Sequence, residues 1–516
     1  MTISTPDYYD VLIAGAGPVG LFLACELQLA GCSVLVIELA SKLPTPLKRA
    51  PFGLRGLSVP TVDSFDRRGL LAPLKARIPD REIAAAAPWM KEERRPGGHF
   101  AGIDFFLDQI DQARWPFRLP HSATPMPADL ESISAVLTDR AEALGVAIRY
   151  GLSVSGVDAT ENDVTVRAGD ETLRGGWLVG CDGGRSVVRK AASFGFTGTD
   201  PEFTGYFAQV EFADPSVLPP GHHDTPGGTY IFDLPDMIRM VEFDGGLHHR
   251  PEPIARDHLQ AVLRRISGAD IALTAIGLAT TWTDRAYLAT EYQRGRVLLA
   301  GDAAHIHSPL GGQGLNLGLG DVMNLGWKLA ATIHGNAAAG LLDSYQRERR
   351  PLAEQVLDWS RAQVALMRPS QSARALRAVV SDLIAAPDGA TYFAERVWGV
   401  SVRYDLGSNH PLVGRSAPDF ELDDGTRFNE HFHQGQALLL DFGGSDHLRT
   451  LADRYGDQIT YLPCKARDPL VLQALFVRPD GFIGWASDQA SEDAEVARIL
   501  SRWLEIPDRN DGITEQ

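Results

Sequence analysis

The chain begins with an apolar run, an amphipathic stretch and a second apolar run. The first run, YYDVLIAG, has the composition of a strand that is buried on both faces of a sheet. The stretch PVGLFLACELQLAG predicts a helix, because Pro18 stands at its start and Gly31 at its end. The run CSVLVIE predicts a second strand. Together they have about the length of a parallel strand, helix and strand unit.

Further along the chain, strand patterns predominate. The segment from Ala128 to Val146 repeats like a helix, and the stretches AIRYG, VSGVDAT, DVTVRAG and ETLRGGWLVG then alternate like antiparallel strands. From about Lys190 to Trp282, short strands and turns prevail. We expect this segment to form a separate, mainly antiparallel sheet that is inserted into the first domain.

The remaining sequence predicts long helices and then a small α/β domain. Val322, Leu325, Leu329 and Ile333 fall on one face of a helix. The next helical pattern, LLDSYQRERRPLAEQVLDWSRAQVALM, is expected to break at Pro351. Pro, Gly and Ser then cluster in DLGSNHPLVGRSAPDF, which predicts a domain boundary.

Composition narrows the class of protein. The 516 residues are 44% hydrophobic and 22% charged, as in ordinary soluble domains. The formal net charge of −17 argues against nonspecific binding to nucleic acid or anionic membranes. The four cysteines form no CxxC pair and no zinc-ligand spacing, so we expect no disulfide framework and no metal site. Without a bilayer-length apolar run or a secretory signal, the sequence predicts a cytoplasmic protein.

The motif GAGPVG lies between the first predicted strand and helix. Gly15 permits a tight turn, Gly17 lets a pyrophosphate approach the backbone, and Gly20 lets helix and strand pack closely. Glu38 ends the next strand, where a carboxylate can accept hydrogen bonds from a ribose. The motif therefore predicts a site for FAD or NAD and not for NADP. The alternative is an ordinary glycine-rich turn followed by a surface glutamate.

Two later motifs favour FAD. The stretch WLVGCDGGRSVVRK places Asp182 and Gly183 at the end of a strand, and GDAAHIHSPLGGQGLN follows the apolar run RVLLA. With GAGPVG, these motifs resemble the single-component (class A) FAD-dependent aromatic hydroxylases. The stretches RAPFGLRGLS, YQRERRP and VRPDGFIGW resemble the same family. The similarity covers nearly the whole chain and is greatest to the branch with a thioredoxin-like C-terminal domain, which includes aromatic polyketide hydroxylases and rifamycin monooxygenases.

The resemblance implies roles for individual residues. Asp302 would bind a ribityl hydroxyl, and Arg49 would lie near the FAD phosphates or the ribityl chain. Pro309 would lie over the flavin ring near the carbon that reacts with oxygen, and it is the best candidate for a catalytic role. The amides near Leu315 and Asn316 would face the N1–C2=O edge of the ring. The implied cofactor-binding residues are Gly15, Gly17, Pro18, Gly20, Glu38, Arg49, Asp182, Gly183, Gly301, Asp302, Pro309, Gly311, Gly314, Leu315 and Asn316.

The sequence departs from the family in one place. Where the family often has a glutamine that contacts the ribityl chain, this chain has Ala128. That contact is expected to be missing or to come from another residue. For His305 and His307 we expect a structural or pocket-lining role.

The resemblance also implies a reaction. NADPH or NADH would bind transiently and reduce the flavin, and O2 would then give a flavin C4a-hydroperoxide that hydroxylates a phenolic or polyketide-like molecule. Baeyer–Villiger oxidation and inactivation of an antibiotic use the same chemistry and remain open. A non-catalytic flavin-binding scaffold is an alternative of another class. The expected partner is a small aromatic molecule, with no nucleic acid and no membrane, and the protein is expected to be a monomer or homodimer.

The substrate would lie between the flavin and the inserted sheet. Aromatic and methionine side chains suit a flat hydrophobic ligand, although for each of them a place in the core of the sheet is the commoner alternative. The predicted substrate residues are Phe203, Tyr206, Tyr230, Phe232 and Met240, and the same segment also offers Phe207, Met237 and Phe243.

The C-terminal segment ALLLDFGGSDHLRTLADRYG has the strand and helix order of thioredoxin. It carries GGSD where a thioredoxin has its two cysteines, and Cys464 is solitary. We therefore expect a structural or association domain without dithiol chemistry.

The predicted fold class is thus α/β, with a Rossmann-like FAD-binding domain, an inserted antiparallel substrate sheet, a helical segment and a thioredoxin-like C-terminal domain. The predicted boundaries are residues 1–189 for the FAD-binding domain, with a segment near 75–120 that joins the substrate domain, 190–282 for the substrate sheet, 283–400 for the return to the first domain and the long helices, and 410–516 for the C-terminal domain.

Overall fold

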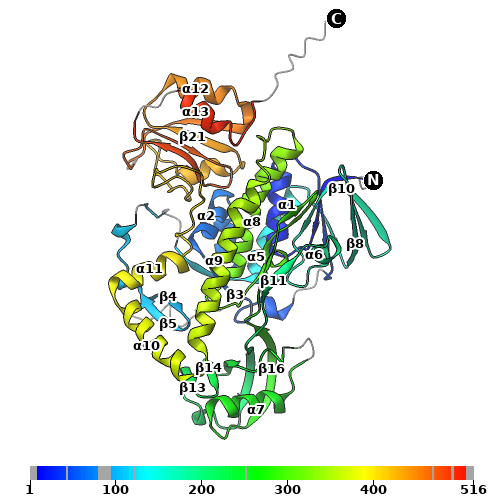
Figure 1. The fold of residues 1–516 in the computed structure, drawn as a ribbon, viewed down its shortest axis with the longest axis vertical. Coiled ribbons are helices and arrows are strands. Elements are labelled where there is room, and N and C mark those ends of the chain that lie inside the picture. Colours follow the sequence, from blue (N-terminus) through cyan, green and yellow to red (C-terminus); the bar gives the residue numbers. More distant parts are fainter. Residues whose placement is uncertain are drawn as a thin grey trace, which may run out of the picture.

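The structure is a computed structural model. It describes residues 8–41, 45–78, 94–115, 117–119, 124–233, 235–249, 253–467, 470–489 and 493–506. The C-terminal domain, orange and red in Figure 1, lies at one end of the molecule, and the inserted sheet with α7 lies at the other. The long helices α8 (Gln313–Ile333) and α9 (Ser344–Met367) run between these ends.

The first domain is built on an eight-stranded sheet around β1 (Tyr9–Ala14). β1 pairs in parallel with β10 on one side and with β2 on the other. The remaining strands of this sheet are β2 (Val34–Glu38), β7 (Ala147–Tyr150), β8 (Val154–Ala159), β9 (Val164–Ala168), β10 (Glu171–Gly180), β18 (Gln293–Arg294) and β19 (Val297–Leu299). The direction expected for β7 was wrong, since β7 pairs in parallel with β2. Alternation reveals a strand but not its direction.

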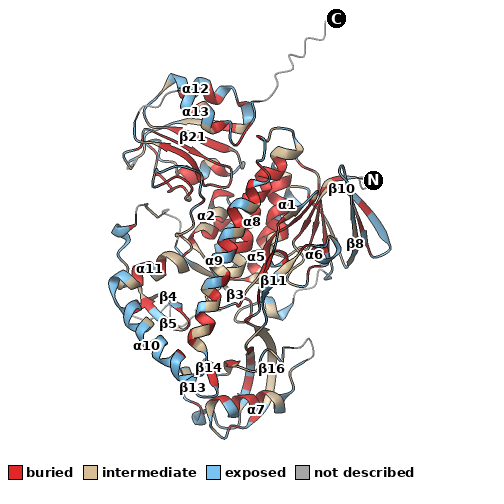
Figure 2. Ribbon diagram, in the orientation of Figure 1, coloured by how far each residue is buried: buried red, intermediate tan, exposed pale blue. Residues whose placement is uncertain are grey.

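Helix α1 (Pro18–Leu29) packs on this sheet and also lies against α5 (Leu130–Ala143) and α8. Figure 2 shows α1 and α8 as largely buried, whereas α10 (Gln371–Ala385) is largely exposed. The shorter elements of this region are α2 (Val59–Arg67), α3 (Leu71–Arg77), α6 (Val187–Ala191), β3 (Leu54–Leu57), β6 (Met126–Asp129), β11 (Phe196–Thr199), β17 (Ala286–Ala289) and β20 (His305–Ile306).

Helix α9 continues through Pro351, so the expected break was wrong. A proline inside a helix costs about 3 kcal/mol, because it removes one hydrogen bond and crowds the preceding turn. Residues on both sides of it, including Glu348, Arg349 and Leu352, are buried against neighbouring elements. Tertiary packing of this face offsets the cost.

The inserted domain is a five-stranded antiparallel sheet in the order β13-β14-β15-β12-β16, with α7 (Arg256–Ser267) on one face. Its strands are β12 (Thr204–Phe212), β13 (Gly221–Thr225), β14 (Gly228–Asp233), β15 (Met237–Glu242) and β16 (Leu273–Thr283). A hairpin of β4 (Pro96–Phe100) and β5 (Ile103–Phe106) packs against α10 and α11 (Pro387–Val397).

The C-terminal sheet has the order β22-β21-β23-β24. β21 pairs in parallel with β22 and antiparallel with β23, and β23 pairs antiparallel with β24. The elements are β21 (Ala437–Asp441), α12 (Asp446–Asp453), β22 (Ile459–Pro463), β23 (Ala474–Val477), β24 (Ile483–Ser487) and α13 (Asp493–Leu500). This is the strand, helix and strand order on which the thioredoxin-like prediction rests, and the predicted α/β fold class is confirmed. The exact domain boundaries stay a prediction.

Candidate functional site

Three glycines shape the loop between β1 and α1. Gly15 has φ +104°, and a Cβ there would lie 2.4 Å from the carbonyl oxygen of Cys181. A Cβ on Gly20 would lie 2.0 Å from the carbonyl oxygen of Gly15. A Cβ on Gly17, by contrast, would have no atom within 4 Å. Gly15 and Gly20 therefore serve close packing, and Gly17 borders open space at the start of the helix.

That open space suits an anion. Gly17 is the N-cap residue of α1 and offers no capping side chain, and Pro18 stands in the first turn. The free amides and the helix dipole of a twelve-residue helix favour negative charge at this end. Glu38, at the end of β2, accepts hydrogen bonds from the amides of Ala16 at 2.6 Å and Ala40 at 2.8 Å. It holds the loop, and its remaining lone pairs can accept ribose hydroxyls.

Asp182 and Gly183 lie at the end of β10, beside the glycine loop. Asp182 Oδ2 accepts the amides of Val187 at 2.7 Å and Val188 at 3.1 Å. Asp182 Oδ1 is buried and has no hydrogen-bond partner among the described residues. Gly183 has φ +76°, and a Cβ there would have no atom within 4 Å. A buried carboxylate oxygen without a partner, next to open space, fits a ligand that carries hydroxyl groups.

The GDAAH motif packs directly against α1. Gly301 has φ +62°, and a Cβ there would lie 3.2 Å from the side chain of Val19. Asp302 is accessible to solvent, yet desolvation by the surrounding protein raises the pKa of its carboxyl, while His305 and Arg55 lower it. The solvent exposure and the desolvation of Asp302 are compatible if its carboxyl lies in a recess that is open to water but surrounded by protein atoms. This position can hold a hydroxylated chain such as the ribityl group.

The glycine loop before α8 has an unusual backbone. Gly311 and Gly312 have φ of +76° and +66°, conformations that favour glycine, and Gly312 is the N-cap of α8 without a capping side chain. Gly312 donates its amide to the carbonyl of Pro309 at 3.1 Å, and Pro309 itself is exposed. A Cβ on Gly314 would lie 3.3 Å from Nε2 of His307. The helix therefore begins with backbone amides that are open to a flat ligand.

The side chain of Asn316 links the start of α8 to residues 52–58, which contain β3 and are called the β3 segment below. Its Oδ1 accepts the amide of Ser58 at 2.8 Å, and its Nδ2 donates to the carbonyl of Gly56 at 2.8 Å. Leu315 is partly buried beside it. The side chain of Asn316 thus has a structural role, which leaves only the amides of this turn for a cofactor.

The two histidines of the motif differ. His305 is fully buried, with Nε2 2.6 Å from Oδ2 of Asp321. His307 Nδ1 lies 2.8 Å from the carbonyl of Ser308, and burial lowers the pKa of His307 to about 4. The ring of His307 is therefore neutral at pH 7, with Nδ1–H as donor and Nε2 as a buried acceptor that has no partner among the described residues.

Two arginines bear on the predicted cofactor site. Arg49 is 59% exposed and contacts Glu131 at 2.5 Å. Arg55 was missed, although RAPFGLRGLS was recognised as a family stretch. It lies directly opposite Ala128 in the β3–β6 pair, close enough to Asp302 for each to shift the pKa of the other. Arg55 therefore lies beside both position 128 and Asp302.

The structure does not bring four of the five predicted substrate residues to this site. Tyr206, Met240 and Tyr230 lie directly opposite one another across β12, β15 and β14, so they share one face of the sheet. With Phe232 they form the core between the sheet and α7. Side chains alternate along a strand, and these four point to the face that α7 covers. Their role in substrate binding stays a prediction.

Phe203 belongs to a different cluster, on the side of the glycine loop. It packs against Trp282 with ring centroids 5.1 Å apart, and the cluster includes Leu310, next to Pro309. On the same side, Phe207 contacts Phe52 of the β3 segment with centroids 4.4 Å apart. Phe207 and Trp282 are only partly buried.

A possible metal group also appears in the inserted domain, where none is expected. Ligand atoms of Glu242, Asp244 and His248 lie within 4.8 Å of one another. Glu242 is paired with Arg265 at 2.7 Å, and Asp244 accepts a hydrogen bond from Thr204 at 2.9 Å. Glu242 Oε2 is buried without a hydrogen-bond partner among the described residues. The absence of a metal site stays a prediction.

The fold and this site define a class. A sheet whose central strands are parallel, a glycine loop, uncapped starts of α1 and α8 and two carboxylates beside open space fit FAD. Residues 8–360 match the sequence family described as FAD binding domain, and residues 410–507 match the family described as aromatic-ring hydroxylase, C-terminal.

Similarity to known proteins extends over the whole chain. It is 41% identical over 507 residues to a monooxygenase of Claviceps purpurea, covering 97% of this chain and 98% of that protein. It is 36% identical over 531 residues to the 12-dehydrotetracycline 5-monooxygenase/anhydrotetracycline 6-monooxygenase of Streptomyces rimosus, covering 97% of this chain and 99% of that protein. The solved anhydrotetracycline hydroxylase from the same species has a TM-score of 0.83 at 34% identity, covering 96% of this chain and 99% of that chain.

The chain therefore belongs to the FAD-dependent aromatic hydroxylases, as the sequence motifs predicted. It is an FAD-dependent monooxygenase, and enzymes of this family use NAD(P)H and O2. The relatives favour aromatic hydroxylation over the alternatives considered above. No helix of the described residues is long and apolar enough to cross a membrane.

Proposed function

We propose that the enzyme hydroxylates a flat, polycyclic aromatic molecule that lies between the glycine loop at Pro309–Gly312 and the face of the inserted sheet opposite α7. The observation that carries this proposal is the placement of part-exposed aromatic rings on that face, beside Leu310 and the β3 segment. Phe207 and Trp282 retain exposed surface there. Aromatic side chains that retain exposed surface suit a planar hydrophobic ligand. The relatives named for anhydrotetracycline are consistent with such a substrate.

Arg239 adds a polar group to the same face. It lies directly opposite Phe207 in the β12–β15 pair, with its guanidinium 5.7 Å from the centroid of the Phe207 ring. A substrate that carries phenol or enol oxygens along one edge would meet this cation while its ring system lies against the aromatic side chains.

The protein's contribution to the reaction is binding, orientation and exclusion of water. When bound, the flavin supplies the redox chemistry, with electrons from NAD(P)H and oxygen from O2. The start of α1 would hold the pyrophosphate, Asp302 and Asp182 would accept hydroxyl groups of the cofactor, and the first amides of α8 would stabilise negative charge at the flavin edge. Arg55 would take the place of the ribityl contact that Ala128 cannot make. Pro309 and Leu310 would cover the reacting region from water.

A pair of variants on one strand tests the proposed substrate face. Phe207→Ala removes a part-buried ring from the face of β12 opposite α7, and Phe212→Ala removes a part-buried ring from the α7 face of the same strand. We expect Phe207→Ala to raise KM about tenfold, which corresponds to about 1.4 kcal/mol for one aromatic contact. Phe212→Ala should lower stability but leave KM within about twofold of the unmodified enzyme.

The assay is NAD(P)H oxidation across phenols, naphthoquinones and tetracyclic polyketides, with peroxide measured in parallel and ¹⁸O2 used to label the product. Substrate-stimulated turnover with one labelled oxygen in the product supports hydroxylation. Equal effects of the two variants on KM would place the substrate elsewhere, and oxidation that yields only peroxide with every compound would contradict the proposed reaction.

We also infer a cytoplasmic location. Disulfides form in oxidising compartments, whereas all four cysteines of this chain are free. Burial raises the pKa of the thiols of Cys25, Cys32 and Cys464 to about 12, so these thiols are poor nucleophiles. A monomer or homodimer remains the proposed oligomeric state.

A further inference from the structure

The C-terminal domain contacts the rear of the helices that begin at the cofactor site. Arg68, the C-cap residue directly after α2, forms a buried bidentate pair with Glu26 of α1, at 2.7 Å for both contacts. The same guanidinium donates to the carbonyl oxygens of Phe432 and Pro479 in the C-terminal domain, at 2.9 and 2.8 Å. The helix whose first turn would hold the pyrophosphate is thereby joined to the C-terminal domain.

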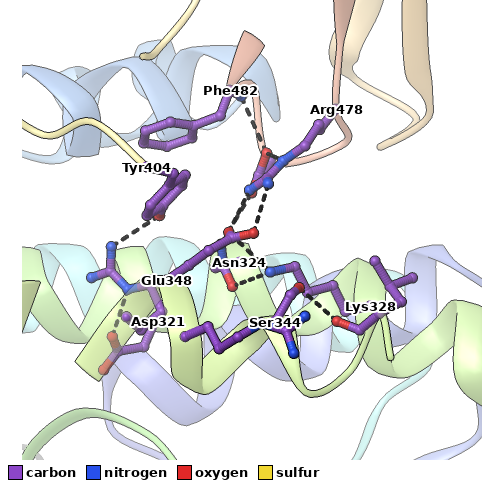
Figure 3. Close-up of polar contacts among 12 residues, drawn as sticks. Asp321, Asn324, Lys328, Ser344, Glu348, Tyr404, Arg478 and Phe482 are labelled. Carbon is purple, nitrogen blue, oxygen red and sulfur yellow. Dashed lines mark hydrogen bonds and ion pairs between the residues drawn. The ribbon is translucent and has the colours of Figure 1, made fainter. Parts of the chain in front are cut away.

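A second buried cluster joins that domain to α8 and α9 (Figure 3). Arg478, at the end of β23, donates two hydrogen bonds of 2.9 Å to the carboxylate of Glu348 in α9 and is fully buried. Lys328 of α8 lies 3.0 Å from the same carboxylate. Asp480 also pairs with Arg478. Burial alone would raise the pKa of Glu348, but Arg478 and Lys328 lower it to about 2.

From this cluster a chain of contacts leads to the flavin loop. The ring of Tyr404 packs on Phe482 of the C-terminal domain with centroids 4.4 Å apart, and its hydroxyl accepts a hydrogen bond from Arg349 at 3.0 Å. Arg349 donates through Nε to Oδ1 of Asp321 at 2.8 Å. Asp321 Oδ2 accepts the amide of Gly301 at 3.1 Å.

Each link in this chain is enclosed by protein. Asp321 is fully buried, Arg349 is 4% exposed and Tyr404 is 3% exposed. Oδ2 of Asp321 accepts the amide of Gly301, the residue directly before Asp302. The same oxygen lies 2.6 Å from Nε2 of His305, three residues after Asp302. One carboxylate therefore holds both ends of the turn that carries Asp302. In this enclosed environment hydrogen bonds to charged groups are strong, and losing one leaves a costly unpaired group.

We propose that the C-terminal domain positions the flavin-binding turn through Tyr404, Arg349 and Asp321. Tyr404 is a positioning residue: it fixes the guanidinium of Arg349, which orients Asp321, and Asp321 holds the turn at residues 301–305 in the conformation that presents Asp302. The domain lacks the cysteines of a thioredoxin, and this role gives it a function in the hydroxylase. The proposal rests on FAD binding by the family and not on the identity of the substrate.

Tyr404→Phe removes one hydroxyl and keeps the ring on Phe482. Tyr461→Phe is the matched control, because it removes a hydroxyl that donates to Asp441 at 2.7 Å within the C-terminal domain, away from the chain of contacts. Three quantities are compared: the Kd for FAD of the FAD-free protein, hydrogen exchange of the peptide that contains residues 301–305, and the unfolding temperature.

We expect Tyr404→Phe to raise the Kd for FAD about tenfold, as for the loss of one hydrogen bond to a charged group, and to speed exchange at residues 301–305. Tyr461→Phe should change neither quantity, even if both variants lose similar thermal stability. Phe482→Leu reaches Tyr404 from the other side and should weaken FAD binding in the same direction.

A Kd within twofold of the unmodified protein for both Tyr404→Phe and Phe482→Leu would overturn the proposal. Equal increases in Kd for Tyr404→Phe and Tyr461→Phe would also overturn it, because they would indicate a general loss of stability. These readouts need no substrate, so they are independent of the proposed hydroxylation.

Discussion

Gly17 tests whether the start of α1 is shaped for a ligand and not only for the fold. Its φ of −71° and ψ of 173° are accessible to any residue, and a Cβ at this position would have no atom within 4 Å. Gly17→Val should therefore leave the FAD-free protein folded, with its free energy of unfolding changed by about 1 kcal/mol or less.

The same substitution should severely weaken FAD binding. The added side chain would occupy the space where the pyrophosphate approaches the helix amides. Losing two charge-assisted hydrogen bonds costs about 3–6 kcal/mol, which raises the Kd about 10²- to 10⁴-fold. The Kd is measured by fluorescence titration of FAD-free protein, and the free energy of unfolding by urea titration of the same sample.

Gly20→Ala is the reciprocal control. Its Cβ would lie 2.0 Å from the carbonyl oxygen of Gly15, so this variant should lower the free energy of unfolding of the FAD-free protein by about 3 kcal/mol. If Gly17→Val bound FAD with an unchanged Kd, the phosphate would not lie at this helix. If Gly17→Val unfolded the FAD-free protein, there would be no space for a side chain at Gly17.

Three further predictions concern groups in and behind the site. Asp302→Ala should raise the Kd for FAD about tenfold, the effect of one lost hydrogen bond to a charged group; an unchanged Kd in the titration would remove Asp302 from the site. Burial lowers the pKa of His307 to about 4, so as pH falls from about 6.5 the unfolded chain binds the proton first and stability declines. His307→Asn should reduce the loss of unfolding free energy between pH 6.5 and 4, measured in urea, by about 2 kcal/mol. This figure is lower than the full pKa shift implies because the ring is part-exposed. Equal pH dependence of stability in the variant and the unmodified protein would contradict the lowered pKa of His307. Glu348→Gln leaves the buried Arg478 and Lys328 without their shared carboxylate and should cost about 3–5 kcal/mol of stability in urea, whereas a loss below about 1 kcal/mol would show that the cluster relaxes freely.

Local patterns predicted much of the cofactor side of the molecule. The glycine spacing in GAGPVG has a physical requirement at each position, and the structure shows close packing at Gly15 and Gly20 and open space at Gly17. The C-terminal domain could also be predicted, because its strand and helix patterns are short and regular. In such segments the local sequence and the tertiary structure agree.

The substrate side could not be read in the same way. A strand such as β12 carries aromatic residues on both faces, with Tyr206 covered by α7 and Phe207 turned to the β3 segment. Sequence alternation separates the two faces but does not show which one is covered. That depends on where α7 packs, which is a tertiary contact.

The buried charges were missed for a related reason. Arg478 is 130 positions from Glu348, and in the sequence each looks like an ordinary surface residue. Only the folded chain shows that the C-terminal domain covers both. The continuous helix at Pro351 also depends on such packing, since local propensity alone favours a break.

The central claim is that three distant segments, residues 15–20, 182–183 and 301–316, hold a single FAD molecule. It is tested most directly by titrating FAD-free protein with FAD while recording the visible spectrum and the bound stoichiometry. The account predicts one FAD per chain, with an oxidised flavin band near roughly 450 nm, and weaker binding in both Gly17→Val and Asp302→Ala. Full occupancy in both variants, or no band with excess FAD, would contradict it.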